Sequence, residues 1–147
     1  MAKAVRNYET IMDQGGKQYN LKRQDLLYPE LSYKINGILF EVFRQLGGGH
    51  REKYYQLAIK EALEKEGIKF KEQFYVPLKF NDKVVGKYFL DFLIEDKLVL
   101  ELKRGKIVAI NNINQVKQYL TALNLKLALV VSFTHTGAKI NRILNEY

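Results

Sequence analysis

The most constraining feature of the chain is a pair of apolar segments joined by a short polar turn. Residues 88–94 (YFLDFLI) and 98–103 (LVLELK) are separated only by Glu95-Asp96-Lys97, which predicts a hairpin with a three-residue loop. Counting outward from that loop puts Asp91 opposite Glu101 on neighbouring strands. Directly opposed side chains have Cβ atoms about 4.5–5.5 Å apart, and like charges there are destabilising. The hairpin therefore predicts a carboxylate pair that needs a cation to hold it together.

The composition limits the chemistry of such a site. The chain has 147 residues, enough for one domain, and its 47% hydrophobic and 27% charged residues are ordinary for a globular protein. It has no cysteine and only two histidines, which excludes disulfides, thiol catalysis and a metal cluster built from thiolates or histidines. A metal site must therefore be made of oxygen ligands, which suit Mg²⁺ or Mn²⁺.

The charge and hydropathy of the chain indicate its surroundings. A net charge of +8 attracts polyanions such as nucleic acids, although many proteins this basic have no such role. No apolar run approaches 18 residues, which excludes a transmembrane helix. The N-terminus has no apolar signal-peptide region, so we expect a cytoplasmic protein that does not act in the membrane.

Apolar periodicity predicts the element order α-α-β-β-β-α-β-α. Residues 1–27 are polar and are expected to form a flexible or loosely packed extension, with residues 28–147 forming the domain. Helices are predicted over 28–46, 51–66, 110–123 and 137–146, and strands over 68–80, 84–94, 98–103 and 126–133. Because the last strand is apolar throughout and follows a helix, we expect it to lie parallel to the third. The prediction is an α/β fold with a mixed four-stranded sheet and helices on both faces.

Asp91, Glu101 and Lys103 form a D…E-x-K pattern on the two central strands. The two carboxylates and the backbone carbonyl of Leu102 could bind Mg²⁺, and Lys103 could hold an attacking water or neutralise charge on a phosphate. The structural alternative is a diagonal Asp91–Lys103 ion pair in an ordinary sheet, which leaves Glu101 without a partner.

Three further groups carry weaker signals when each is taken alone. Glu52 could supply a third carboxylate, although a first-turn glutamate that favours the helix dipole is the simpler interpretation. Gln115 and Tyr119 share a helix face and could position a phosphate or the lysine, or be a core tyrosine with a solvated neighbour. Arg104 and Lys106, which follow the third strand, could position a phosphate or belong to a solvated loop.

Gly49, Glu52 and Tyr55, in the segment GHREKYY, resemble the signature of the GxxExxY protein family. That family looks like a branch of the PD-(D/E)XK nuclease superfamily. The resemblance covers nearly everything from Leu31 to Leu144, and its further matching segments are 85–91, 100–103, 110–115, 119–120 and 129–133.

This resemblance implies a restriction-endonuclease-like core. In the superfamily, the acidic residues at the positions of Asp91 and Glu101 ligate a divalent metal, and the lysine at the position of Lys103 assists catalysis. A helix glutamate, matched here by Glu52, often completes the site.

The resemblance also assigns roles outside the acid pair and shows two departures. Gln115 and Tyr119 are similar to the Q-x-x-x-Y motif of the recombination and CRISPR-associated exonuclease branch. Leu90 stands where the name motif has proline, and Phe89 stands where the GxxExxY relatives are expected to have a basic residue.

The expected function is a Mg²⁺- or Mn²⁺-dependent nuclease that hydrolyses phosphodiester bonds, with DNA as the expected substrate. Two alternatives stay open. One is a catalytically silent nucleic-acid-binding module that keeps the nuclease fold, which the basic charge fits equally well. The other is a homo-oligomeric scaffold such as a homodimer.

Overall fold

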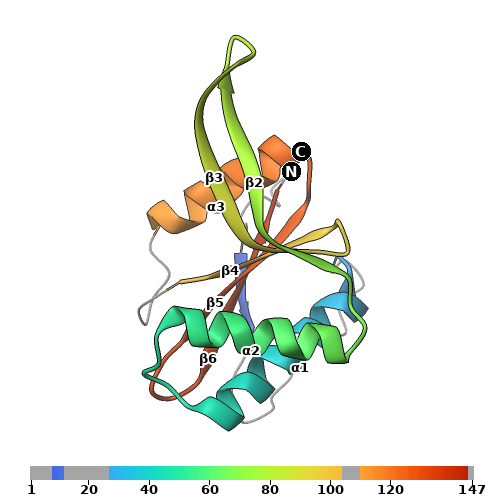
Figure 1. Cartoon of the computed structure of the whole chain (residues 1–147), viewed down its shortest axis with the longest axis vertical. Coiled ribbons are helices and arrows are strands. Elements are labelled where there is room, and N and C mark those ends of the chain that lie inside the picture. Colours follow the sequence, from blue (N-terminus) through green and yellow to red (C-terminus); the bar gives the residue numbers. More distant parts are fainter. Residues whose placement is uncertain (1–7, 12–26, 104–109, 146–147) are drawn as a thin grey trace.

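The computed structural model describes residues 8–11, 27–103 and 110–145 of the chain. Their elements follow in the order β1 (Tyr8–Ile11), α1 (Pro29–Leu46), α2 (Glu52–Lys65), β2 (Phe70–Phe80), β3 (Lys83–Ile94), β4 (Leu98–Leu102), α3 (Ile110–Leu123), β5 (Leu127–Phe133) and β6 (Ala138–Leu144). Figure 1 shows these elements as one sheet with helices on either side of it. None of the helices in the described part of the chain combines the length and the hydropathy that a membrane-spanning helix needs.

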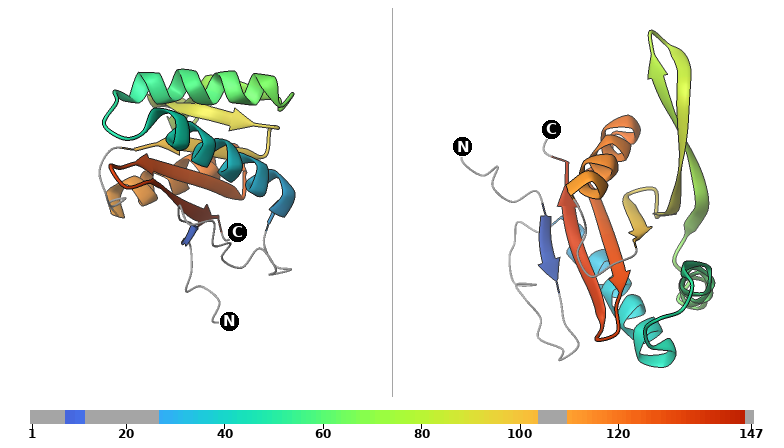
Figure 2. Two further views of the ribbon diagram at one scale, coloured as in Figure 1. Left: turned by 90° about the horizontal axis from the view of Figure 1, so that it is seen from below. Right: turned by 90° about the vertical axis from the view of Figure 1, so that its left-hand side faces the viewer.

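The six strands form one mixed sheet in the order β1-β6-β5-β4-β3-β2. Strands β4 and β5 are parallel, as predicted, because α3 connects them, and the other neighbouring pairs are antiparallel. One face of the sheet packs on α1 and α2 through a cluster that includes Ile35, Ile59 and Leu100, and the other packs on α3 through Val116, Leu120 and Val130. Figure 2 shows α1 and α2 lying across one face and α3 across the other. Helices on both faces are thus confirmed.

The last element is a correction to the prediction. We expected a helix over residues 137–146, but Ala138–Leu144 forms β6, which lies between β5 and β1. Ile140, Ile143 and Leu144 have helical spacing, which is the reason for the error. Five strands therefore lie after residue 28, not four.

The N-terminal extension contributes a further strand. Within residues 1–27, Tyr8–Ile11 forms β1 and pairs antiparallel with β6, from Tyr8 opposite Ile143 to Ile11 opposite Ile140. This pairing covers the outer edge of β6. The division of the chain at residues 27 and 28 stays a prediction.

The predicted hairpin between β3 and β4 is confirmed with its register. Ile94 pairs with Leu98, and Phe92 pairs with Leu100. The amide of Lys97 donates to the carbonyl of Ile94 at 2.9 Å, which closes the three-residue loop. The same count along the two strands puts Asp91 at the level of Glu101.

The two faces of the β2–β3 ribbon exchange sides close to Asp91. Phe70 and Phe92 pack on the α1–α2 side of the sheet, whereas Phe74 and Leu90 pack on the α3 side. Residues two apart on a regular strand share a face, so the change requires a strong local twist. Gln73 lies at the twist with a φ of 46°, and the pairing skips from Glu72–Phe92 to Phe74–Leu90. Asp91, the residue skipped on β3, is thus presented where the ribbon changes faces.

Candidate active site

Asp91 and Glu101 each accept a hydrogen bond from a backbone amide of the other's strand. The amide of Asp91 donates to Glu101 Oε1 at 2.7 Å, and the amide of Leu102 donates to Asp91 Oδ2 at 2.8 Å. Each carboxylate thus accepts a hydrogen bond from the opposing strand, at the point where the β3–β4 pairing ends. The two acids are therefore neighbours on adjacent strands, as the hairpin register predicts.

The pair is costly when both acids are ionised. Glu101 is only 3% exposed, and burial together with the Asp91 charge raises the pKa of its carboxyl to about 8. Burial also raises the pKa of Asp91, although the Leu102 amide, the Gln73 amide and Lys103 act in the opposite direction. A cation placed between the two groups would remove this cost.

Each carboxylate has a second oxygen that faces a side-chain donor. Gln73 Nε2 donates to Asp91 Oδ1 at 3.4 Å, and Lys103 Nζ lies 3.7 Å from Glu101 Oε2. Both contacts are longer than the two backbone bonds. A metal ion could therefore bind Asp91 Oδ1 and Glu101 Oε2 while the two backbone hydrogen bonds stay intact.

Lys103 joins the acid pair through Glu101. The ion pair in the structure is Lys103–Glu101, not the diagonal Asp91–Lys103 pair of the structural alternative. The Lys103 amide donates to the carbonyl of Val131 at 2.9 Å, which fixes its backbone to β5. Its side chain is 22% exposed, whereas that of Glu101 is 4% exposed, so Lys103 is the more solvent-accessible partner of the ion pair.

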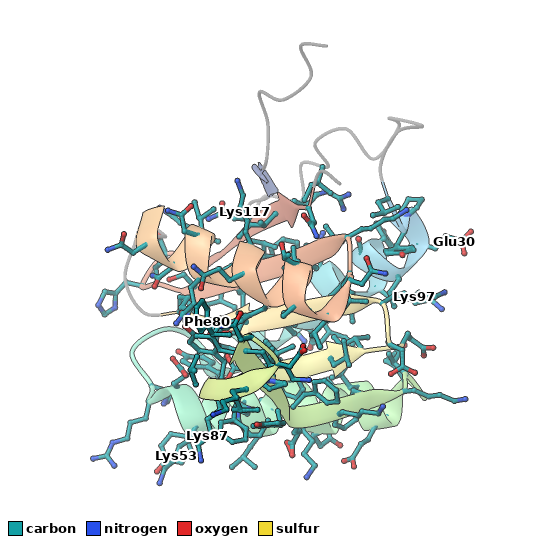
Figure 3. All side chains as sticks on the ribbon, turned by 90° about the horizontal axis from the view of Figure 1, so that it is seen from above. Glu30, Lys53, Phe80, Lys87, Lys97 and Lys117 are labelled. Atoms are coloured by element: carbon teal, nitrogen blue, oxygen red, sulfur yellow. The ribbon has the colours of Figure 1, made fainter. Side chains whose placement is uncertain are left out.

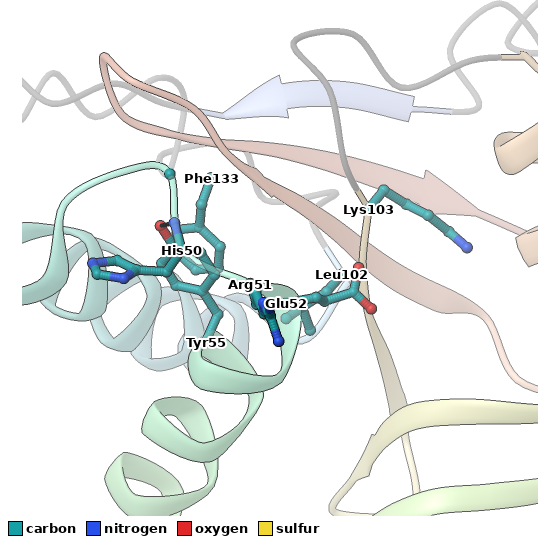
Figure 4. A pocket seen from close by; sticks show the side chains of 8 residues that line it. His50, Arg51, Glu52, Tyr55, Leu102, Lys103 and Phe133 are labelled. Carbon is teal, nitrogen blue, oxygen red and sulfur yellow. Dashed lines mark hydrogen bonds between the residues drawn. The ribbon is translucent and has the colours of Figure 1, made fainter.

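A cleft with a volume of about 300 Å³ opens beside the acid pair, between α2 and the end of β4. It is lined by Gly49, His50, Arg51, Glu52, Tyr55, Leu102, Lys103 and Phe133. Figure 4 shows Glu52 directed toward the end of β4, where Leu102 and the following residue Lys103 lie. The charge of Glu52 contributes to the raised pKa of Glu101, so Glu52 faces the same site from the start of α2.

Tyr55 holds the start of α2 in this place. Its hydroxyl donates to the Gly47 carbonyl at 2.6 Å and accepts from the His50 amide at 3.3 Å. Its ring stacks on Phe133 of β5, with the centroids 4.2 Å apart and the planes 7° apart. Gly49 has a φ of 90°, which favours glycine. The spacing of Gly49, Glu52 and Tyr55 therefore has a physical basis, because the first and last fix the helix start that carries the glutamate.

On the other side of the acid pair lies α3. Tyr119 is 4% exposed, and its ring lies 5.1 Å from that of Tyr88 on β3. Burial raises the pKa of Tyr119, and the charges of Glu101 and Asp91 raise it further, so the ring lies close to the pair. Gln115 is partly buried one turn earlier on α3. Arg104 and Lys106 lie outside the described residues.

The comparisons with known proteins agree with this fold. The sequence model of the PD-(D/E)XK nuclease superfamily matches residues 29–143. The chain belongs to this superfamily. No curated protein matches the chain. The crystal structure of SSO0001 superposes with a TM-score of 0.53 at 17% identity, over 65% of this chain and 50% of that one. The likeness to SSO0001 shows a shared fold, and this chain spans half the length of that protein.

Members of the PD-(D/E)XK superfamily usually use divalent metals, and the acid pair fits such an ion. Asp91 and Glu101 are neighbouring carboxylates, one partly buried and one buried, and each has one oxygen with only a long contact. Carboxylate oxygens are hard ligands, and a divalent cation would offset the repulsion between these two. Among residues 27–103 and 110–145, no three acidic or histidine side chains gather closely enough to hold a metal by themselves. Glu52 therefore stays a predicted ligand, and waters or substrate oxygens would complete the coordination.

Two glutamines near the PD-(D/E)XK acid pair were not predicted from the sequence. Gln73 donates to the Asp91 carboxylate, and Gln56 Nε2 on α2 donates to the Asp91 carbonyl at 3.4 Å. Gln73 adopts a backbone conformation that non-glycine residues rarely adopt, which costs about 1–3 kcal/mol. The sequence alone does not reveal the role of Gln73, which is a single polar residue in a strand of alternating apolar and polar residues. Gln73 reaches Asp91 because the ribbon twists there, and that twist depends on how both faces of the ribbon pack.

Proposed function

We propose that the protein is a divalent-metal-dependent nuclease that hydrolyses phosphodiester bonds, with DNA as its substrate and within the GxxExxY branch of its superfamily. The observation that carries this proposal is the pairing of the buried Glu101 with the partly buried Asp91, with Lys103 Nζ 3.7 Å from Glu101 Oε2. This arrangement combines two anionic oxygen ligands with a cation that can face a phosphate. A purely structural Lys103–Glu101 ion pair would not require Asp91 as a second acid beside it.

In this proposal, Asp91 and Glu101 hold the ion, with Glu52 and the Leu102 carbonyl as further ligands. Bound Mg²⁺ or Mn²⁺ would polarise a phosphoryl oxygen and lower the pKa of a coordinated water. Lys103 would exchange its contact with Glu101 for one with the attacking water or with the charge that develops on the phosphate. Its partial exposure and its place in the lining of the cleft support this role, because a substrate could reach its side chain there.

The residues around this centre would position the substrate. Tyr119 packs beside the acids from α3, and Gln115 lies on the same helix face, so both are proposed to orient the phosphate or Lys103. Arg104 and Lys106 follow Lys103 directly in the sequence and are proposed to contact the DNA backbone. A net charge of +8 favours the approach of such a polyanion.

The test is cleavage of labelled single-stranded, duplex and branched DNA by the purified protein with Mg²⁺ or Mn²⁺. We expect Glu101→Gln and Lys103→Ala to lower the cleavage rate by about 100-fold or more, because each removes charge from the reacting centre. Lys139→Ala is the matched control, since Lys139 is an exposed lysine on β6 and should leave the rate unchanged.

Cleavage that survives both site variants would show that another site or a contaminant acts. DNA binding that falls steeply with salt, is insensitive to chelator and yields no products would instead establish a silent binding module. A homodimer detected by light scattering without DNA binding would favour the scaffold.

A further inference from the structure

The β2–β3 ribbon extends well beyond the rest of the molecule as an arm, here residues 75–89 (Figure 1). Its apolar side chains are unusually exposed for a folded β-hairpin. Those with more than two fifths of their surface exposed are Tyr75, Leu78, Phe80, Val84, Val85 and Phe89. Single exposed apolar residues are normal, but six on one hairpin indicate a contact surface.

Four of the arm residues form a compact patch on one face. Tyr75 pairs with Phe89, and Pro77 pairs with Lys87, so the four side chains occupy two adjacent cross-strand positions. The Tyr75 and Phe89 rings lie 5.8 Å apart, and Lys87 Nζ lies 5.9 Å from the centre of the Phe89 ring. We call these four residues the arm patch. Two exposed rings with an adjoining ammonium are suited to a partner that has flat groups to stack on the rings and negative charge to pair with the ammonium.

The arm patch adjoins the acid pair. Phe89 precedes Asp91 by two residues on β3, which is about 7 Å along a strand. On β2, Tyr75 is likewise two residues from Gln73, which contacts Asp91. Figure 3 shows Lys87 projecting to the same side of the molecule as Lys53 at the start of α2. A chain bound on the patch could therefore continue into the cleft.

We propose that the arm patch stacks the bases of a single-stranded nucleic acid and leads that strand to the acid pair. Unpaired bases stack on exposed aromatic rings, whereas a duplex conceals the base faces. The arm has three lysines against one aspartate, and the whole chain has a net charge of +8, which favours an anionic strand over a second copy of this basic protein. This inference rests on the proposed nuclease function and specifies its substrate as single-stranded.

The absence of tryptophan in the chain allows a direct test of stacking. Phe89→Trp introduces a single tryptophan into the patch and keeps an aromatic ring there. With metal removed by chelator, an oligo-deoxythymidine should quench its fluorescence, and an abasic strand of the same length and charge should not. Tyr33→Trp, at a half-exposed position on α1, is the matched control and should not respond to either strand.

The affinity for the same oligonucleotide provides the second readout. Phe89→Ala should weaken binding of the base-bearing strand about tenfold, and Phe89→Trp should restore it. Equal affinity for base-bearing and abasic strands, or no quenching in the Phe89→Trp variant, would overturn the proposal. So would dissociation of a wild-type dimer by Phe89→Ala, because the patch would then be an interface between copies. Both readouts are taken without cleavage, so their failure is distinct from a failure of the nuclease assay.

Discussion

Glu101 is almost completely buried and has another carboxylate as its neighbour, which makes it the most informative single residue of the chain. The sequence predicts its position well, because a three-residue turn fixes which residues oppose each other. It does not predict how the acids are held, since the backbone bonds of Asp91 and Leu102 depend on where the strand pairing ends. It also does not predict the contact of Gln73 with Asp91, because this contact depends on the local twist of the β2–β3 ribbon.

The raised pKa of Glu101 predicts a pH-dependent stability in the absence of metal. Its carboxyl has a pKa of about 8 in the folded protein, above its ordinary value of 4.5, so the folded state binds a proton more tightly. This contribution to the free energy of unfolding is fully present below the lower value and is lost as the pH rises through the upper one. Urea unfolding at pH 5 and pH 8.5 should show a loss of a few kcal/mol in the wild type.

Glu101→Gln should remove most of this pH dependence, because the amide keeps the shape of the side chain and does not titrate. Glu66→Gln, an exposed glutamate at the end of α2, should keep the wild-type dependence. An equally steep loss of stability in Glu101→Gln would show that another group titrates.

At the scale of elements, the connection between α1 and α2 determines where Glu52 lies. Gly47 and Gly49 have φ values of 72° and 90°. Gly48 packs against the β5–β6 turn so closely that an added Cβ would lie 2.4 Å from the main-chain oxygen of Thr134. Gly47 and Gly49 thus allow the backbone conformation of this loop, and Gly48 allows its close packing.

Gly48→Ala should therefore destabilise the protein by about 1–3 kcal/mol, because backbone atoms would have to move. Gly37→Ala is a control of opposite sign. Gly37 lies within α1 with open space around its Cβ position, and alanine there should stabilise the helix by about 0.5–1 kcal/mol. Thermal unfolding of both variants gives the comparison, and an unchanged melting temperature for Gly48→Ala would contradict the close packing.

The elements also show why the sequence predicts the two ends of the chain less well than its centre. α1, α2 and α3 have long periodic stripes and were predicted to within two residues at each end. β6 was not, because Arg142 occupies a buried position where an apolar residue would have revealed the alternation. Arg142 is accommodated there by bonds to Ser32 Oγ and the Leu27 carbonyl, contacts more than 100 residues away in the sequence.

At the scale of the whole molecule, the fold brings three separate segments to one place. The β3–β4 hairpin supplies the acids and Lys103, the start of α2 supplies Glu52, and α3 supplies Tyr119. The sequence predicts the two-faced sheet and the parallel β4–β5 pair because a buried apolar strand follows a helix. It does not predict that the arm projects from the molecule, because a twisted, exposed ribbon and a flat, buried one have similar alternation of apolar and polar residues.

The central claim is that the Asp91–Glu101 pair binds a divalent metal ion, and calorimetric titration with Mn²⁺ tests it most directly. We predict saturable binding by the wild type, its loss in Asp91→Asn, and its retention in Asp82→Asn at the exposed tip of the arm. Wild-type protein that takes up no Mn²⁺, or Asp91→Asn protein that binds it with undiminished affinity, would contradict the account.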